Sequence, residues 1–274
     1  MIRTVTSTAN DRMIELTGRG YLSHSAISTF QQCPLKYRFK YIDGLPEETV
    51  AASLVFGGAI HKAVEFHFQE LLAGEQAPGI DELLAEYHDA WQGREPGEVQ
   101  FGKDDDVNTL GKLAERMLIA FQASEFANPN GTIVAVEEEF QGELVPGCPD
   151  LLGRVDLLIE RGDTWTITDL KTSRSRWSQE QADDSAEQLL LYSELVQQVA
   201  PKQTLKLEFA VITKTKEPVV ERYDVLIDPR RIERTKRIVS KVWRAIEAGN
   251  FYPAPSPMNC PSCPFRVPCR AWQG

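Results

Sequence analysis

The chain has 274 residues, of which 42% are hydrophobic, a length that allows one large domain or two small ones around a substantial core. Its formal net charge of −10 excludes a surface that binds polyanions everywhere, so nucleic-acid binding would need a local basic region. No stretch is long and apolar enough to span a membrane, and the N-terminus lacks a signal-peptide apolar region, so we expect a cytoplasmic protein.

The first half of the chain has helical patterns. Residues 25–41 mix aromatic and basic side chains, among them Tyr37 and Arg38, and residues 56–72 repeat apolar residues at helical spacing. Further helices are predicted at residues 80–91, 107–126, 179–199 and 229–248. Strands are predicted at residues 132–140, 153–160, 165–171, 204–213 and 219–227.

This order of elements predicts an α/β fold within residues 1–274. A helical part (22–131) precedes a core (132–248), and a tail (249–274) rich in proline and cysteine closes the chain. The tail has neither a helical nor a strand period. Burial of apolar side chains alone would stabilise the tail little, so we expect a cross-link to hold it in place.

Two aspartates mark the centre of the core. Asp156 lies in one short apolar segment, and Asp169 and Lys171 lie in the next, with turn residues 161–163 between them. Neighbouring strands would bring both carboxylates to one end of a sheet, where they repel each other unless a cation joins them. Hard oxygen ligands favour Mg²⁺ or Mn²⁺, and a lysine beside such a metal suits phosphodiester hydrolysis. A solvated hairpin with charged ends is the alternative.

Other candidates could complete such a site. His61 follows two glycines at the start of a helical segment and is a suitable metal ligand, although a surface histidine is the alternative and His67 competes with it. Glu137, Glu138 and Glu139 end a predicted strand, and alternation alone does not decide which of them faces the site. Gln188 and Tyr192 lie one helical turn apart and project from one face. Two basic residues that follow Lys171, Arg174 and Arg176, could contact phosphate.

Four of the five cysteines form a second group. Cys260, Cys263 and Cys269 have the spacing C-x₂-C-x₅-C, and Cys33 lies far upstream; Cys148 is left over as a loop cysteine. Four thiolates drawn from both ends of the chain could hold either zinc or a [4Fe–4S] cluster, and spacing alone does not choose between them.

Taken together, these motifs resemble the RecB-type branch of the PD-(D/E)XK nucleases. The matching elements, in order, are GGAIH, a strand glutamate, GRVD, DLK and QLLLY. The one-plus-three cysteine pattern is similar to that of the iron–sulfur subgroup, which includes AddB nuclease domains and CRISPR-adaptation exonucleases. The resemblance covers residues 22–269. It implies a restriction-endonuclease-like core, in which helices flank a central mixed sheet, and a C-terminal iron–sulfur tail that packs with Cys33.

The resemblance also implies roles for individual residues. His61, Asp156, Asp169 and the Leu170 carbonyl would bind Mg²⁺ or Mn²⁺, Lys171 and Glu137 would be catalytic, and the four cysteines would hold a [4Fe–4S] cluster, with Zn²⁺ as the alternative. Glu137 is chosen because the family often places an aromatic residue three positions later, here Phe140. Gln188, Tyr192, Arg174, Arg176, Tyr37 and Arg38 would support the site or contact DNA.

We therefore expect a metal-dependent DNA exonuclease that acts on single strands or duplex ends. Its role would lie in DNA repair, recombination, or phage- or CRISPR-related processing, with a separate helicase or repair protein as a partner. No Gly-Lys-Ser/Thr element of an ATP-driven motor is present. The alternative is a non-catalytic DNA-binding or assembly subunit with a nuclease-like fold.

Overall fold

The computed structural model describes residues 8–93 and 97–274, which group into two compact units. Unit 2 contains residues 50–138 and 154–228. Unit 1 contains the described residues up to 49, together with 139–153 and 229–274. No helix of the described residues is both long enough and apolar enough to span a membrane.

A mixed sheet forms the centre of unit 2. β5 (Asp150–Arg161) pairs antiparallel with β6 (Thr164–Ser173), β6 pairs parallel with β7 (Thr204–Thr213), and β7 pairs antiparallel with β8 (Val220–Val225). β4 (Thr132–Gly142) also pairs with β5. The predicted hairpin is confirmed: Gly162, at φ +61°, and Asp163 connect β5 to β6. Glycine is favoured there because the backbone is left-handed.

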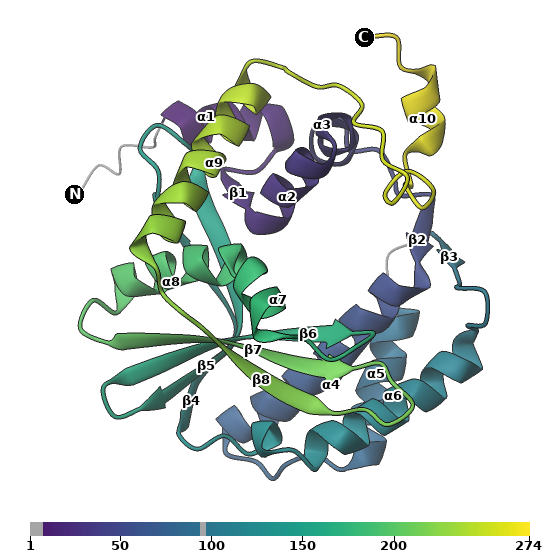
Figure 1. The fold of residues 1–274 in the computed structure, drawn as a ribbon, viewed down its shortest axis with the longest axis vertical. Helices are drawn as coiled ribbons and strands as arrows, with labels where there is room; N and C mark the ends of the chain where they lie inside the picture. Colours follow the sequence, from purple (N-terminus) through teal and green to yellow (C-terminus); the bar gives the residue numbers. More distant parts are fainter. Residues whose placement is uncertain (1–7, 94–96) are drawn as a thin grey trace. The chain divides into compact units, whose positions relative to one another are not determined.

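Three helices cover one face of this sheet, as Figure 1 shows: α4 (Ala52–Ala73), α5 (Ile80–Gln92) and α6 (Val107–Gln122). Their apolar sides form one buried cluster with Leu157, Leu170 and Ile212 of the strands. A 3₁₀ turn (Glu125–Ala127) follows α6, and β2 (Thr49–Ala51) pairs with β3 (Glu98–Gln100) in a separate small sheet. The predicted α/β architecture, a mixed sheet flanked by helices, is confirmed.

The single helix predicted at residues 179–199 is wrong. The structure has α7 (Gln179–Asp184) and α8 (Glu187–Val199), separated by a turn at Ser185. The break lets α7 pack on β8 while α8 packs on β6 and β7. The buried side of α8 carries Leu189 and Tyr192.

Unit 1 is mostly helical. It contains α1 (Thr8–Thr17), α2 (His24–Gln32), α3 (Pro34–Tyr37), a π turn (Arg38–Ile42), α9 (Pro229–Glu247) and α10 (Arg266–Ala271). β1 (Tyr21–Ser23) pairs parallel with the start of β5.

Two expectations for unit 1 need correction. The helix predicted at residues 25–41 is interrupted at Cys33, which is extended (φ −163°, ψ 106°) because it precedes Pro34. The tail, for which the sequence shows no period, contains α10. Pro268 is tolerated there because it lies in the first turn, where backbone N–H groups need no helical partner.

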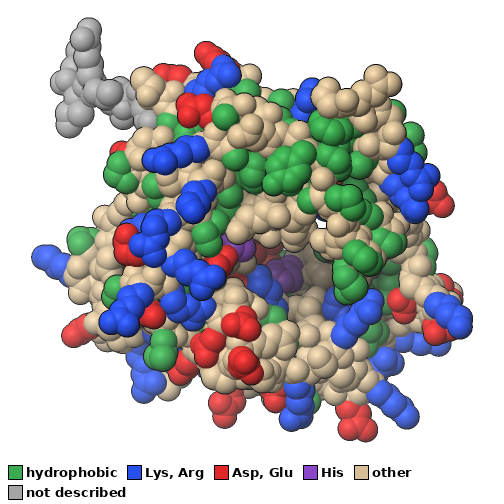
Figure 2. Space-filling model, turned by 45° about the horizontal axis from the view of Figure 1, so that its top comes forward, with side chains coloured by type: hydrophobic (Ala, Val, Ile, Leu, Met, Phe, Trp, Pro, Cys, Tyr) green, Lys and Arg blue, Asp and Glu red, His purple; other side chains and the backbone are tan. Residues whose placement is uncertain are grey.

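Charge is mixed on the face of the molecule that Figure 2 draws. On the face drawn in Figure 2, basic and acidic side chains are interspersed, in agreement with the net charge of −10. Binding of a polyanion therefore depends on local groups.

Candidate active site

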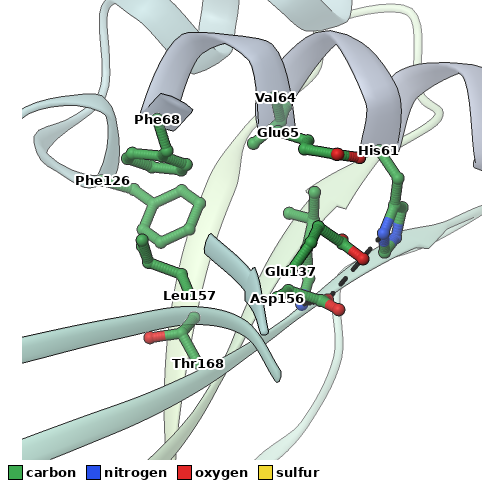
Figure 3. A pocket seen from close by; sticks show the side chains of 10 residues that line it. His61, Val64, Glu65, Phe68, Phe126, Glu137, Asp156, Leu157 and Thr168 are labelled. Atoms are coloured by element: carbon green, nitrogen blue, oxygen red, sulfur yellow. Dashed lines mark hydrogen bonds and ion pairs between the residues drawn. The ribbon is translucent and has the colours of Figure 1, made fainter. Parts of the chain in front are cut away.

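Three potential ligand groups meet in unit 2, each from a different element. His61 comes from α4, Glu137 from β4 and Asp156 from β5, and one ligand atom of each lies within 4.8 Å of the others. Figure 3 shows the Glu137 and Asp156 carboxylates beside the His61 ring, whose Nδ1 is 3.8 Å from Asp156 Oδ2. One nitrogen and several hard oxygens form a donor set that suits Mg²⁺ or Mn²⁺.

Asp156 is held in place by the neighbouring strand. Its Oδ2 accepts a hydrogen bond of 2.7 Å from the backbone N–H of Leu170 on β6. Burial, followed by the charges of Asp169 and Glu137, raises the pKa of Asp156 well above its usual range. Carboxylates this close destabilise one another, and a bound cation would relieve that repulsion.

Asp169 lies deeper and outside the three-residue group. It is 2% exposed, and its Oδ2 lies 2.6 Å from Lys171 Nζ. That contact is an ion pair of poor hydrogen-bond geometry, and among the described residues no other group donates to Oδ2. The fit to a divalent metal therefore rests on the imidazole and two carboxylates of His61, Glu137 and Asp156, with the Asp169 carboxylate already paired to Lys171.

A chain of hydrogen bonds fixes the lysine. Lys171 Nζ donates to Gln188 Oε1 (3.1 Å), and Gln188 Nε2 donates to the Tyr192 hydroxyl (2.9 Å). Burial raises the pKa of Tyr192 to about 12, so its phenol stays protonated at neutral pH. The residues of the QLLLY segment thus connect directly to the lysine of β6.

Glu137 has an unusual backbone. Its φ of +53° is left-handed, a conformation that costs a non-glycine residue about 1–3 kcal/mol. The Glu137 side chain is half-buried and lies 3.4 Å from Arg154, whereas Glu138 and Glu139 are exposed. Burial, with the Glu65 charge, raises the pKa of Glu137. Local strain thus accompanies the turning of this one glutamate toward His61 and Asp156.

The two histidines of α4 differ in environment. Burial lowers the pKa of His61 to about 4, although the charge of Asp169 and a hydrogen bond to the Leu170 backbone oppose the shift. A neutral imidazole can ligate a metal. His67 is 2% exposed, lies edge-on to Phe121, and has its Nε2 2.8 Å from the Ala127 carbonyl oxygen, so it belongs to the apolar core.

A cavity of about 780 Å³ opens beside this group, within unit 2. Its walls include the candidate residues His61, Glu137, Asp156, Gln188, Tyr192 and Arg174. Three further residues line the cavity although nothing in the sequence around them predicted a place in the site: Glu65, Arg154 and Lys214. The place of Lys214 becomes predictable once the strand order is known, because the ends of two adjacent parallel strands meet at one edge of the sheet.

The remaining basic and aromatic candidates lie elsewhere. The Arg176 side chain is 66% exposed and pairs with Glu221 at 3.3 Å. In unit 1, Tyr37 is fully buried and stacked against Phe251, so it can support the fold but cannot touch DNA from this position. Arg38 is partly exposed and pairs with Asp43 at 3.2 Å.

Four cysteines line a single cavity of about 300 Å³ in unit 1: Cys33, Cys260, Cys263 and Cys269. All four are free thiols, and no three of their sulfur atoms lie mutually within 4.8 Å. Burial and the other three cysteines raise the pKa of Cys269. Cys148 lies apart from this cavity and is buried.

Comparison with known proteins identifies the family. The model of the PD-(D/E)XK nuclease superfamily matches residues 21–270. A structure from Eubacterium rectale, described as a candidate exonuclease, is similar with a TM-score of 0.57 at 16% identity, covering 100% of this chain and 94% of that one. At that identity the likeness concerns the fold alone. The structure of SSO0001 matches at 15% identity, covering 90% of this chain and 95% of that one, with a TM-score of 0.38 that supports no conclusion.

No curated protein matches the chain. The family match covers nearly the whole length and includes the acidic site, Lys171 and Gln188. The chain belongs to the PD-(D/E)XK nuclease superfamily.

Proposed function

We propose that the protein is a Mg²⁺- or Mn²⁺-dependent DNA exonuclease of the RecB type that acts on single strands or duplex ends. The observation that carries this proposal is the convergence of His61, Glu137 and Asp156 in unit 2, the same unit in which the Asp169–Lys171 pair lies. The exonuclease mode comes from the resemblance of the motifs to the RecB-type branch, and the Eubacterium rectale protein with the similar fold is itself described as a candidate exonuclease. The role that fits is DNA repair, recombination, or phage- or CRISPR-related processing, alongside a separate helicase or repair protein.

Each residue has a task in this proposal. His61, Asp156 and Asp169 would hold the metal, with the Leu170 carbonyl as a further ligand, and the metal would offset the charge that develops on the phosphate. Lys171, positioned by Gln188, would hydrogen-bond the attacking water or a phosphate oxygen. Glu137 lies close enough to share the cation with Asp156.

A cutting assay tests this function. Single-stranded and duplex DNA, labelled at the 5′ or the 3′ end, is incubated with Mg²⁺, with Mn²⁺, or with EDTA. We expect shortening from an end only when metal is present, and loss of cutting in Asp169→Ala. Full activity of a folded Asp169→Ala protein would exclude this site. DNA binding without cutting under any of these conditions would instead indicate the non-catalytic DNA-binding subunit.

We further propose that the four cysteines hold a structural [4Fe–4S] cluster. Four tetrahedral Zn–S bonds of about 2.3 Å would bring the sulfur atoms to about 3.8 Å from one another, closer than any three of them lie here. The cavity of about 300 Å³ leaves space for a larger group. Backbone N–H groups also face two of the sulfurs: Ala254 N is 3.5 Å from Cys33 Sγ, and Ser256 N is 3.2 Å from Cys260 Sγ. Such donors stabilise cluster thiolates.

A further inference from the structure

Two cations lie at adjacent strand ends beside the proposed catalytic group. In the parallel pairing of β6 with β7, the last pair is Ser173 with Thr213, so Arg174 and Lys214 directly follow the ends of the two strands. A backbone hydrogen bond from Lys214 N to the Ser173 carbonyl oxygen extends the pairing to this point. The backbone positions of both residues are therefore fixed by the sheet.

Among the residues that the structure describes, no carboxylate pairs with Arg174 or Lys214. Within the described ranges 8–93 and 97–274, no acidic oxygen lies within 4.0 Å of the Arg174 guanidinium or the Lys214 amine. Lys214 Nζ lies over the Phe56 ring, 5.3 Å from its centre. Burial, with the charge of Arg174, lowers the pKa of Lys214. Two like charges held together cost free energy, which a bound anion would recover.

Both side chains line the 780 Å³ cavity that contains His61, Asp156 and Gln188. They also line a neighbouring hollow of about 420 Å³, whose other charged residues are Lys103, Asp104 and Asp105. We place the anion in the larger cavity because that cavity also contains His61, Asp156 and Gln188 of the proposed catalytic group. Arg174 follows Lys171 by three residues, which places the two backbone positions at most about 10 Å apart.

We propose that Arg174 and Lys214 together bind a phosphate of the substrate strand that is close to, but distinct from, the phosphate being cut. The inference rests on the proposed nuclease function and adds a second contact to it. The pair would set the direction in which the strand leaves Lys171 and would require a substrate that extends past the cleaved bond. Single-stranded nucleic acid fits this role because its phosphates continue at regular intervals along a flexible backbone.

Binding measurements test the pair separately from catalysis. The full-length Asp169→Asn protein, expected not to cut, is titrated with fluorescent oligo(dT) in EDTA at several salt concentrations. Loss of one phosphate contact should reduce the slope of log affinity against log salt by about 0.7. We expect that reduction on adding Lys214→Gln or Arg174→Gln, and recovery of the slope with Lys214→Arg. Lys202→Gln, an exposed lysine outside both hollows, is the matched control and should leave the slope unchanged.

A methylphosphonate scan then locates the contact. Each phosphate of the oligonucleotide is replaced in turn with an uncharged methylphosphonate. Binding to the Asp169→Asn parent should weaken most when one particular phosphate is replaced. In the protein that also carries Lys214→Gln, replacing that phosphate should weaken binding no more than replacing the others. An unchanged slope in Lys214→Gln, or an equal fall in Lys202→Gln, would overturn the proposal. If the wild type cuts DNA but Lys214→Gln leaves the salt slope unchanged, the cation pair alone is refuted. If Lys214→Gln removes the methylphosphonate effect but the wild type never cuts DNA, the nuclease function alone is refuted. If the Asp169→Asn parent binds no DNA, both are refuted.

Discussion

The Nζ atom of Lys171 donates a hydrogen bond to Oε1 of Gln188 over 3.1 Å, while the same nitrogen lies 2.6 Å from Asp169 Oδ2. The lysine is thus held between a strand and helix α8. Gln188 in turn donates to Tyr192, so its amide orientation is fixed by both neighbours. This geometry makes Gln188 a positioning residue for Lys171.

Gln188→Ala should lower kcat by about 10–100-fold, the usual effect of losing a group that orients a catalytic residue. The reason is that Lys171 would lose the acceptor that holds its amine. Cutting rates at saturating DNA and Mn²⁺ check this. Tyr192→Phe keeps the amide and is expected to have a smaller effect. Equal rates for Gln188→Ala and the wild type would show that Lys171 needs no such support.

Asp156→Asn should make the metal-free protein at least as stable as the wild type at pH 7. The folded protein raises the pKa of this carboxyl, so ionising it costs stability as the pH rises above the unfolded pKa of about 3.8. Asparagine removes that charge and can still accept the hydrogen bond from Leu170 N. Thermal unfolding in EDTA measures the difference, with Asp163→Asn in the exposed turn as the control. A clearly lower Tm for Asp156→Asn would contradict the repulsion described for this cluster.

His67 should make unit 2 sensitive to acid. Burial lowers the pKa of His67 in the folded protein, whereas the unfolded side chain gains a proton near pH 6.5. Protons therefore favour unfolding, and this contribution to stability is lost as the pH falls below about 6.5. In His67→Gln, the drop in Tm between pH 7 and pH 5 should be smaller than in the wild type. His88→Gln, at an exposed position, should leave that drop unchanged; a similar reduction in both variants would refute the assignment.

Arg222→Ala should destabilise the protein by about 1–3 kcal/mol because it leaves a buried charge without its main partner. Glu208 is 0% exposed, and its Oε2 accepts hydrogen bonds of 3.1 and 2.7 Å from Arg222. Thr168 donates to the other oxygen at 2.8 Å. Urea unfolding should show that adding Glu208→Gln recovers part of the loss. No loss in the single variant would mean that solvent or Lys206 compensates fully.

Cys263→Ala should remove iron and lower the Tm. The three remaining cysteines cannot complete a four-thiolate cluster, and the packing around Phe265 would loosen with it. Absorbance near 400 nm and iron content after anaerobic purification report the cluster. Cys148→Ala, outside the cavity, should retain the absorbance. If the wild type contains zinc instead of iron, the four cysteines form a zinc site and the cluster proposal is wrong.

The sequence predicts much of the site because its signals are local. The turn at Gly162 forces β5 and β6 to pair, and that pairing brings Asp156 beside Leu170. The spacing of Gln188 and Tyr192 on one helical face likewise predicts their contact. The sequence does not predict features that depend on a single backbone angle. The left-handed φ of Glu137 decides which of three glutamates turns inward, and alternation along the strand gives no sign of it.

Other features depend on partners that are distant in the chain. The cation pair of Arg174 and Lys214 requires knowledge that β6 and β7 are parallel and in a particular register. The break in the predicted helix 179–199 follows from two packing partners, β8 and β7, rather than from a strong breaker residue. Alternation of apolar residues predicts elements, but their order in the sheet comes from tertiary packing.

Binding of Mn²⁺ tests the central claim most directly. Calorimetric titration with Mn²⁺ of the wild type, Asp156→Asn and the control Asp163→Asn measures whether the carboxylates of β5 and β6 bind a divalent cation. Our account predicts that the wild type and Asp163→Asn bind Mn²⁺ with similar affinity, and that Asp156→Asn binds it at least about ten-fold more weakly. Equal affinity in all three proteins would contradict it.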